Sequence, residues 1–371
     1  MNGQRDRPRQ HWVIYALGGG WGHLNRALAL GRIAVRRHAV TILTNSSCVE
    51  YVLERLDLTP RPPSLLGKGE RGDVCLEAIA PDLSRAETCD RVQKFLLQTK
   101  YDCLIVDTFP RGLGGELAEI LPQLQVPRIL VHRDLNPQYV QAKGLAEFVE
   151  QHFEQILVPG EGYEVPLAYL PQAQHTAPWL IRSADELMPL DQARSLLRLP
   201  TNPTQVVIIC ASGSAPPSLP GKGAGGLGST ETQLFGTLTY QLHQALPEVT
   251  VRCLSPQCPP QCPPELWASH WPGMDCLQMA DVVVGGAGYN TTYECAALKV
   301  PLISFAFKRL YDRQARRAQQ HSYEVCSVTE AIALVKALLQ QAAEPRQQRQ
   351  LSYTNGVFRA VELIESAIAG S

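Results

Sequence analysis

Short apolar segments recur along the chain, and glycine turns directly follow two of them. Residues 11–17 and 282–284 are apolar runs typical of strands that are buried on both faces of a sheet. Glycines follow at 18–22 and at 285–288, and each glycine turn leads into a segment with helical spacing. This succession of strand, glycine turn, helix and next strand predicts parallel sheets with right-handed crossovers.

The same pattern predicts the remaining elements. Further buried strands are expected over residues 40–44, 74–79, 103–106, 128–131, 156–158, 206–210, 249–253 and 302–304. Helices are expected over residues 48–56, 83–99, 191–199, 231–246, 330–341 and 347–368, and between the second glycine turn and Leu298. We therefore predict an α/β fold with two Rossmann-like domains that face a cleft. The expected domains are 1–160 and 190–345, joined by a proline-rich linker over 161–189 and followed by a C-terminal helix over 346–371.

Composition narrows the class of protein. The chain has 371 residues, a net charge of -1 and a pI near 6.8, which argues against a nucleic-acid partner bound by a basic face. Its 11 cysteines are dispersed, as expected of reduced thiols in the cytoplasm. Cys253, Cys258 and Cys262 lie close together, but their spacing fits no zinc pattern, so we expect no metal site. No apolar run reaches the ~20 residues of a transmembrane helix, and the N-terminus lacks a signal-peptide core.

The second glycine turn is a candidate anion site. A helix start offers free N–H groups and the positive end of the helix dipole, which favour a diphosphate. Asn290 or Thr291 is expected to cap this helix. Glu294 stands three residues after Thr291, the spacing of a capping box, so it either satisfies a backbone N–H or faces a bound nucleoside. A glycine turn without any ligand is the alternative for the whole segment.

Residues 281–304 and 310–314 resemble the donor-binding segment of nucleotide-sugar glycosyltransferases of the GT-B fold. Among these, the segment is most similar to the bacterial peptidoglycan N-acetylglucosaminyltransferase family and its uncharacterised relatives. The resemblance implies that a nucleotide-sugar donor, with UDP as the expected nucleotide, binds here. The donor-binding residues that it implies are Ser212, Gly213, Gly286, Gly288, Tyr289, Asn290, Thr291, Glu294, Asp312, Arg313 and Gln314. In that family the acidic residue of the helix holds the ribose hydroxyls and the Asp-x-Gln element contacts the donor sugar.

The N-terminal glycine loop resembles the catalytic-side loop of the same family. It contains Gly20, Gly22 and His23, and Asn25 and Arg26 are expected to line the same opening. A helix N-terminus lowers the pKa of a histidine, which favours the neutral imidazole that a general base needs. Local packing of His23 is the alternative, and the resemblance favours the base.

Two aspartates follow predicted strands at the edge where open α/β sheets carry their ligand groups. Asp107 ends one strand and is a second catalytic candidate, although it could instead cap a helix; Asp134 follows the next strand and is assigned to the acceptor side. Two similar Gly-Lys-Gly segments, at 62–69 and 216–223, are interpreted as inserted loops rather than phosphate loops.

These features predict a glycosyltransferase that moves a sugar from a nucleotide-diphosphate donor to a hydroxyl acceptor. The resemblance implies inversion of configuration. No Asp-x-Asp pair occurs that would hold a metal ion, so no cofactor is expected. Two alternatives stay open: a nucleotide-sugar 2-epimerase or hydrolase that uses Asp107, Asp134 and Glu294, and a non-catalytic nucleotide-sugar-binding protein. The acceptor is unassigned, with lipid-linked acceptors and peripheral contact with the inner membrane face among the options.

Overall fold

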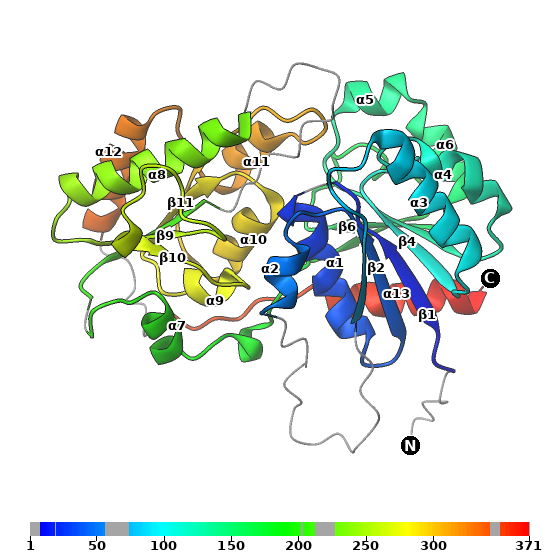
Figure 1. Ribbon diagram of the computed structural model, residues 1–371, viewed down its shortest axis with the longest axis horizontal. Helices are drawn as coiled ribbons and strands as arrows, with labels where there is room; N and C mark the ends of the chain where they lie inside the picture. Colours follow the sequence, from blue (N-terminus) through cyan, green and yellow to red (C-terminus); the bar gives the residue numbers. More distant parts are fainter. Residues whose placement is uncertain are drawn as a thin grey trace.

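Two parallel sheets, each with helices around it, form two α/β domains that lie side by side (Figure 1). The structure is a computed structural model that describes residues 8–18, 20–55, 74–201, 203–211, 227–341 and 349–370. Both Gly-Lys-Gly segments and the predicted donor residues Ser212 and Gly213 lie outside the described residues. The two sheets confirm the predicted fold class.

The N-terminal domain is a seven-stranded parallel sheet with the order β3-β2-β1-β4-β5-β6-β7. Its strands are β1 (His11–Tyr15), β2 (Ala39–Thr44), β3 (Val74–Ala78), β4 (Cys103–Asp107), β5 (Arg128–Val131), β6 (Gln155–Pro159) and β7 (Ala173–Thr176). Its helices are α1 (Trp21–Ala34), α2 (Val49–Leu53), α3 (Arg85–Gln98), α4 (Glu116–Ile120), α5 (Pro137–Ala142) and α6 (Leu145–His152). Because β1 lies between β2 and β4, the loops that follow β1 and β4 meet at one edge of the sheet.

The C-terminal domain is a six-stranded parallel sheet with the order β10-β9-β8-β11-β12-β13. Its strands are β8 (Val206–Cys210), β9 (Thr250–Leu254), β10 (Trp267–Ala268), β11 (Val282–Gly286), β12 (Leu302–Phe305) and β13 (Tyr323–Glu324). The helices of this half are α7 (Leu190–Leu196), α8 (Leu227–Ala245), α9 (Met274–Leu277), α10 (Tyr289–Ala297), α11 (Gln314–His321) and α12 (Val328–Gln340). The central position of β11 places its glycine turn and the start of α10 opposite the N-terminal domain.

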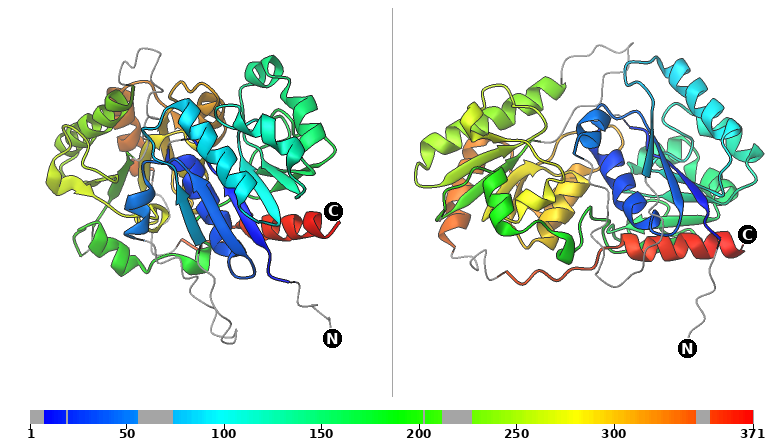
Figure 2. Two further views of the ribbon diagram at one scale, coloured as in Figure 1. Left: turned by 45° about the vertical axis from the view of Figure 1, so that its right-hand side comes forward. Right: turned by 60° about the horizontal axis from the view of Figure 1, so that its bottom comes forward.

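The last helix, α13 (Val357–Gly370), returns to the N-terminal domain, where it packs on α1 and β7 (Figure 2). Val357, Val361 and Ile364 are fully buried there, and burial of each such side chain contributes about 1.5–3 kcal/mol. The predicted start of this helix at residue 347 is wrong, because residues 349–356 are not helical and α13 begins at Val357. Asn355 explains the difference, since its side chain accepts from the N–H groups of Leu180 and Val357 and so ties the segment to the interdomain connection.

Two further predictions need correction. The stretch expected to be a linker contains β7, which pairs with β6 and extends the first sheet. Residues 173–176 form backbone hydrogen bonds with β6 although their side chains are mostly polar. Neither Asn290 nor Thr291 caps α10: the cap is Gly288, and both residues lie inside the first turn. In the described part of the chain no helix is long and apolar enough to cross a membrane.

Candidate active site

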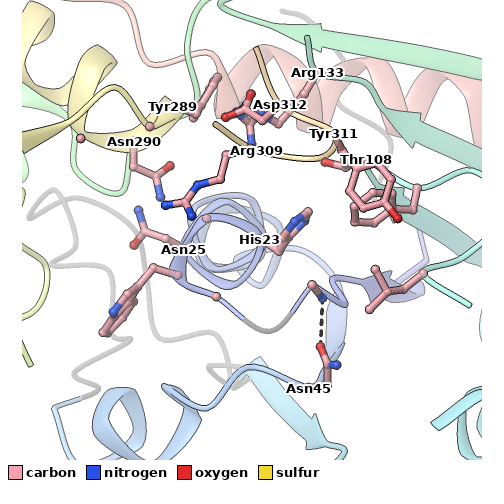
Figure 3. Close-up of a pocket in the computed structure, with 18 of the residues that line it drawn as sticks. His23, Asn25, Asn45, Thr108, Arg133, Tyr289, Asn290, Arg309, Tyr311 and Asp312 are labelled. Carbon is pink, nitrogen blue, oxygen red and sulfur yellow. Dashed lines mark hydrogen bonds and ion pairs between the residues drawn. The ribbon is translucent and has the colours of Figure 1, made fainter. Parts of the chain in front are cut away.

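A cavity of about 1080 Å³ lies between the two domains. The N-terminal domain lines it with the loops after β1 to β5. The C-terminal domain lines it with α10, the segment between β12 and α11, and the loops after β9 and β10. Figure 3 shows His23 and Asn25 on the side of α1, facing Tyr289, Asn290 and Arg309 from the other domain. Such a shape, enclosed by two domains, is typical of sites that bind a small molecule.

His23 is held by a carboxylate beneath it. It occupies the first turn of α1, and its Nδ1 lies 2.6 Å from Oδ2 of Asp107 at the end of β4. Arg26, one turn further along α1, donates to both oxygens of Asp107 at 2.8 and 2.7 Å. All three groups meet because β1 and β4 are neighbouring strands.

The charges of this cluster determine the protonation state and the tautomer of the His23 imidazole. Burial opposes ionisation of Asp107, but Arg26 and His23 outweigh it and hold the pKa of the carboxyl well below its ordinary value. A carboxylate only accepts, so Nδ1 of His23 carries the proton and Nε2 is left with a free lone pair. Burial lowers the pKa of His23 below 6.5, more than the contact with Asp107 raises it. His23 is therefore neutral at pH 7, and its Nε2 can accept a proton.

Gly18 leaves room for the imidazole. A Cβ at this position would lie 2.2 Å from Cδ2 and 2.5 Å from Nε2 of His23. The backbone N–H of Gly18 donates to Oδ1 of Asn45 at 2.9 Å, which fixes the turn (Figure 3). The glycine is thus required by the position of the histidine ring.

The start of α10 faces the cavity across from His23. Gly286, Gly288, Tyr289, Asn290 and Thr291 all line it, and no side chain caps the helix. The first N–H groups of a helix have no partner within the helix and attract anions. This end of α10 therefore has the electrostatic character of an anion site.

Two arginines add positive charge beside this helix start. Arg133 follows β5 and lies against the ring of Tyr289, the first residue of α10, with its guanidinium 5.0 Å from the ring centre. It is 8% exposed, and its buried Nε has no hydrogen-bond partner among the described residues. Arg309 lines the same cavity and donates to Glu231 at 2.7 Å. Burial lowers the pKa of Arg133 from 12.5, but the group stays charged at neutral pH.

Glu294 lies in the cavity wall, on the side of the N-terminal domain. The amide of Asn25 donates to its Oε1 at 3.5 Å, and the indole N–H of Trp271 donates to Asn25 at 3.1 Å. Glu294 is 7% exposed, and burial raises its pKa from 4.5 to about 7. In the described part of the chain, no hydrogen bond joins this carboxyl to a backbone N–H of α10. Glu294 therefore does not form the capping box that its spacing from Thr291 allowed.

The Asp-x-Gln segment joins the two domains. Asp312 accepts from Arg133 at 3.3 Å and from Arg317 at 2.9 Å. Burial opposes its ionisation, but these arginines lower its pKa to about 2. Arg313 binds Asp134 through Nε at 2.8 Å, so both of these candidates are engaged in an ion pair between the domains.

The structure brings most of the predicted site residues into one cavity. Those that line it are Gly20, Gly22, His23, Asn25, Asp134, Gly286, Gly288, Tyr289, Asn290, Thr291, Glu294, Asp312 and Gln314. Arg26, Asp107 and Arg313 do not line it. Arg26 was expected to line the opening, and the structure contradicts this. Its guanidinium instead forms an ion pair with Asp107, and Asp107 in turn contacts His23.

Sequence reasoning missed the aromatic side chains of the cavity and did not assign Arg133 to the site. Phe109, Tyr311 and Trp271 line it but belong to unremarkable loop sequences. Arg133 did carry a signal, since it follows a buried strand at the same edge as Asp107. The described residues contain no group of three or more His, Cys, Asp or Glu side chains arranged to hold a metal ion.

No family model and no curated protein matches this chain. Solved structures do match it over nearly its whole length. The calicheamicin glycosyltransferase CalG4 is 13% identical, with 98% of this chain and 99% of that chain covered and a TM-score of 0.58. UGT89C1 of Arabidopsis thaliana, solved in complex with UDP, is 12% identical, with 97% and 100% covered and a TM-score of 0.58. MurG of Acinetobacter baumannii is 14% identical, with 97% and 100% covered and a TM-score of 0.51.

This chain has the GT-B fold. The fold that the sequence resemblance implied is therefore confirmed. At these identities the match concerns architecture, and the activity has to be argued from the site.

Proposed function

We propose that the protein is a glycosyltransferase that moves a sugar from a UDP-sugar to a hydroxyl acceptor with inversion of configuration. The observation that carries the proposal is the opposition of two groups across one cavity: the neutral imidazole of His23 and the uncapped start of α10. A base and an anion site are the two parts that this reaction requires. Solved glycosyltransferases of the same fold, including one bound to UDP, support the assignment.

The reaction is a single displacement. The acceptor oxygen forms a bond to the anomeric carbon of the sugar while the bond from that carbon to the diphosphate breaks. Nε2 of His23 takes the acceptor proton, and the resulting imidazolium is stabilised by the ionised carboxylate of Asp107. The diphosphate leaves with the electron pair of the broken bond. One displacement at one carbon inverts its configuration.

The leaving diphosphate is neutralised by the protein. The N–H groups at the start of α10 point to it, and the guanidinium groups of Arg133 and Arg309 lie beside it. We assign to these groups the role that a divalent ion has in metal-dependent transferases. Turnover is therefore expected to be unchanged in excess EDTA.

Glu294 is assigned to the donor ribose. Its carboxyl lies six residues into α10, in the cavity wall, where the amide of Asn25 is its only hydrogen-bond partner among the described residues. A carboxylate accepts from two adjacent hydroxyls, and such charge-assisted bonds contribute about 1.5–3 kcal/mol. Gln314 lines the cavity beside Asp312 and is assigned to the donor sugar.

The engaged state of the other carboxylates favours a transferase over an epimerase or hydrolase. Asp107 is buried beneath His23, and Asp134 is held by Arg313 and Arg316. An epimerase or hydrolase would need a carboxylate that reaches the sugar or its water. His23 is the better placed base, and its partner is an acceptor hydroxyl.

Two measurements test the proposal. Calorimetry with UDP should give saturable binding that Glu294→Ala weakens at least tenfold, while Glu324→Ala, at an exposed position on β13, leaves it unchanged. A thermal-shift panel of UDP-sugars should then identify the donor, since a ligand at 100 times its Kd stabilises by about 2.7 kcal/mol. Absence of UDP binding, or release of UDP from the donor without any acceptor at the full rate, contradicts a UDP-sugar transferase.

A further inference from the structure

The loops after β3, β4 and β5 line one part of the cavity, and Tyr311 of the other domain packs against Phe109 and Tyr139 there; we call this part the arm. The backbone of Tyr311 is fixed in this position, because its carbonyl accepts from the N–H of Asn136 at 2.9 Å. His23 lies next to Phe109 of this arm, so under the proposed function the arm receives the acceptor.

Aromatic rings form one wall of this arm. The ring of Phe109 lies 5.4 Å from the imidazole of His23 and 5.2 Å from the ring of Tyr311. Tyr311 in turn lies 4.8 Å from Tyr139. These separations are those of interacting aromatic pairs, so a ligand ring placed against this wall gains the same contacts. Leu83 and Leu113 add apolar surface.

Cations without carboxylate partners line the same arm. Arg85, Arg111 and Lys143 face it, and none of the three is within 4.0 Å of a carboxylate oxygen in the described ranges. Arg111 is half-buried, its guanidinium lies 4.3 Å from the ring centre of Phe148, and its buried Nε lacks a hydrogen-bond partner in the described part of the chain. Arg85 donates to the carbonyl of Gly114, whereas the charges of Arg111 and Lys143 have no carboxylate partner among the described residues.

The acidic groups around this part of the cavity have other partners. Glu116 accepts from the hydroxyl of Tyr15, the thiol of Cys89 and the N–H of Gly114. Asp134 is paired with Arg313 and Arg316, and Asp82 is exposed. A buried cation whose donors are unsatisfied is costly unless a ligand satisfies it. An arginine binds a carboxylate with two parallel hydrogen bonds, which fits the half-buried position of Arg111.

From the aromatic wall and the unpaired cations we propose that the acceptor is a hydroxylated aromatic acid. Its phenolic hydroxyl lies at Nε2 of His23, its ring lies against Phe109 and Tyr311, and its acidic group binds Arg111 and Lys143. This inference rests on the proposed function for the role of His23, but the binding of such an acid does not depend on any donor.

The test compares a matched pair of probes by calorimetry on the full chain. 3-(4-Hydroxyphenyl)propanoate should bind at least tenfold more tightly than its amide, 3-(4-hydroxyphenyl)propanamide, at low salt, and the difference should shrink as salt screens the charge. Arg111→Gln should weaken the acid about tenfold and leave the amide within twofold. Lys143→Gln, at an exposed position, should act in the same direction. Arg91→Gln, on α3 outside the cavity, is the control and should change neither affinity.

The outcomes separate the claims. Equal affinities for acid and amide, or equal losses for both on Arg111→Gln and Lys143→Gln, overturn the anionic acceptor. Tighter binding of 12-hydroxydodecanoate than of the phenolic acid overturns the aromatic part. UDP binding is measured on the same samples: if UDP binds and the acid does not, the acceptor class fails while the transferase stands, and the reverse result rejects the donor instead.

Discussion

Replacement of Glu294 by glutamine should abolish the pH dependence that this residue imposes on stability. Glutamine keeps the size of the protonated carboxyl and its acceptor for the amide of Asn25, but it does not ionise. Burial raises the pKa of Glu294 from 4.5 to about 7, so the folded chain holds a proton that the unfolded chain has lost between these pH values. Stability must then fall as the pH rises through this window.

The magnitude follows from the width of the window. At 1.36 kcal/mol for each pH unit, the interval from 4.5 to about 7 corresponds to roughly 3 kcal/mol. Below pH 4 the wild type and Glu294→Gln should be equally stable. Above pH 7.5 the glutamine variant should be more stable by roughly that amount, because it avoids the cost of a buried charge.

The assay is urea denaturation of both proteins at half-unit steps between pH 4 and pH 8, with Glu324→Gln on β13 as the control for an exposed carboxylate. Parallel stability curves for wild type and Glu294→Gln would refute the argument, since they would mean that Glu294 ionises as easily in the folded chain as in the unfolded chain. The affinity for UDP should change with pH in the direction opposite to stability. For the wild type it should rise through the same window as the carboxylate becomes available to the ribose, and it should be flat with pH for the glutamine variant.

Three further substitutions test other parts of the site. His23→Ala should lower turnover by about 10²–10⁴-fold without changing UDP affinity, and the acid limb of the rate, with a midpoint below 6.5, should disappear with it; a persisting limb assigns the base elsewhere. Gly18→Ala should reduce turnover at least tenfold at unchanged UDP affinity, because its Cβ would lie 2.2 Å from the imidazole. Arg133→Leu should weaken UDP about tenfold and uridine hardly at all in calorimetry, and equal losses for both ligands would place the arginine away from the diphosphate.

The local pattern of the sequence was sufficient to predict the two βα units and several residues that line the cavity. A buried strand, a glycine turn and a helix form one continuous stretch, so the position of His23 at the start of α1 follows from neighbouring residues alone. The same holds for Glu294 on α10. Helix boundaries were less predictable: α13 begins at Val357 because Asn355 and Gly356 are held by distant backbone, which no local periodicity encodes.

The partnerships that give the site its chemistry depended on tertiary structure. Asp107 meets His23 across 84 positions and Arg26 across 81, because the sheet order places β4 next to β1. Asn25 reaches Glu294 across 269 positions, since only the packing of one domain against the other brings their surfaces together. The sequence by itself determined which polar groups stand at the ends of strands and the starts of helices. Strand order and domain packing decided which of these groups face the cavity and which form buried ion pairs. The reason is that burial and charge pairing depend on neighbours in space.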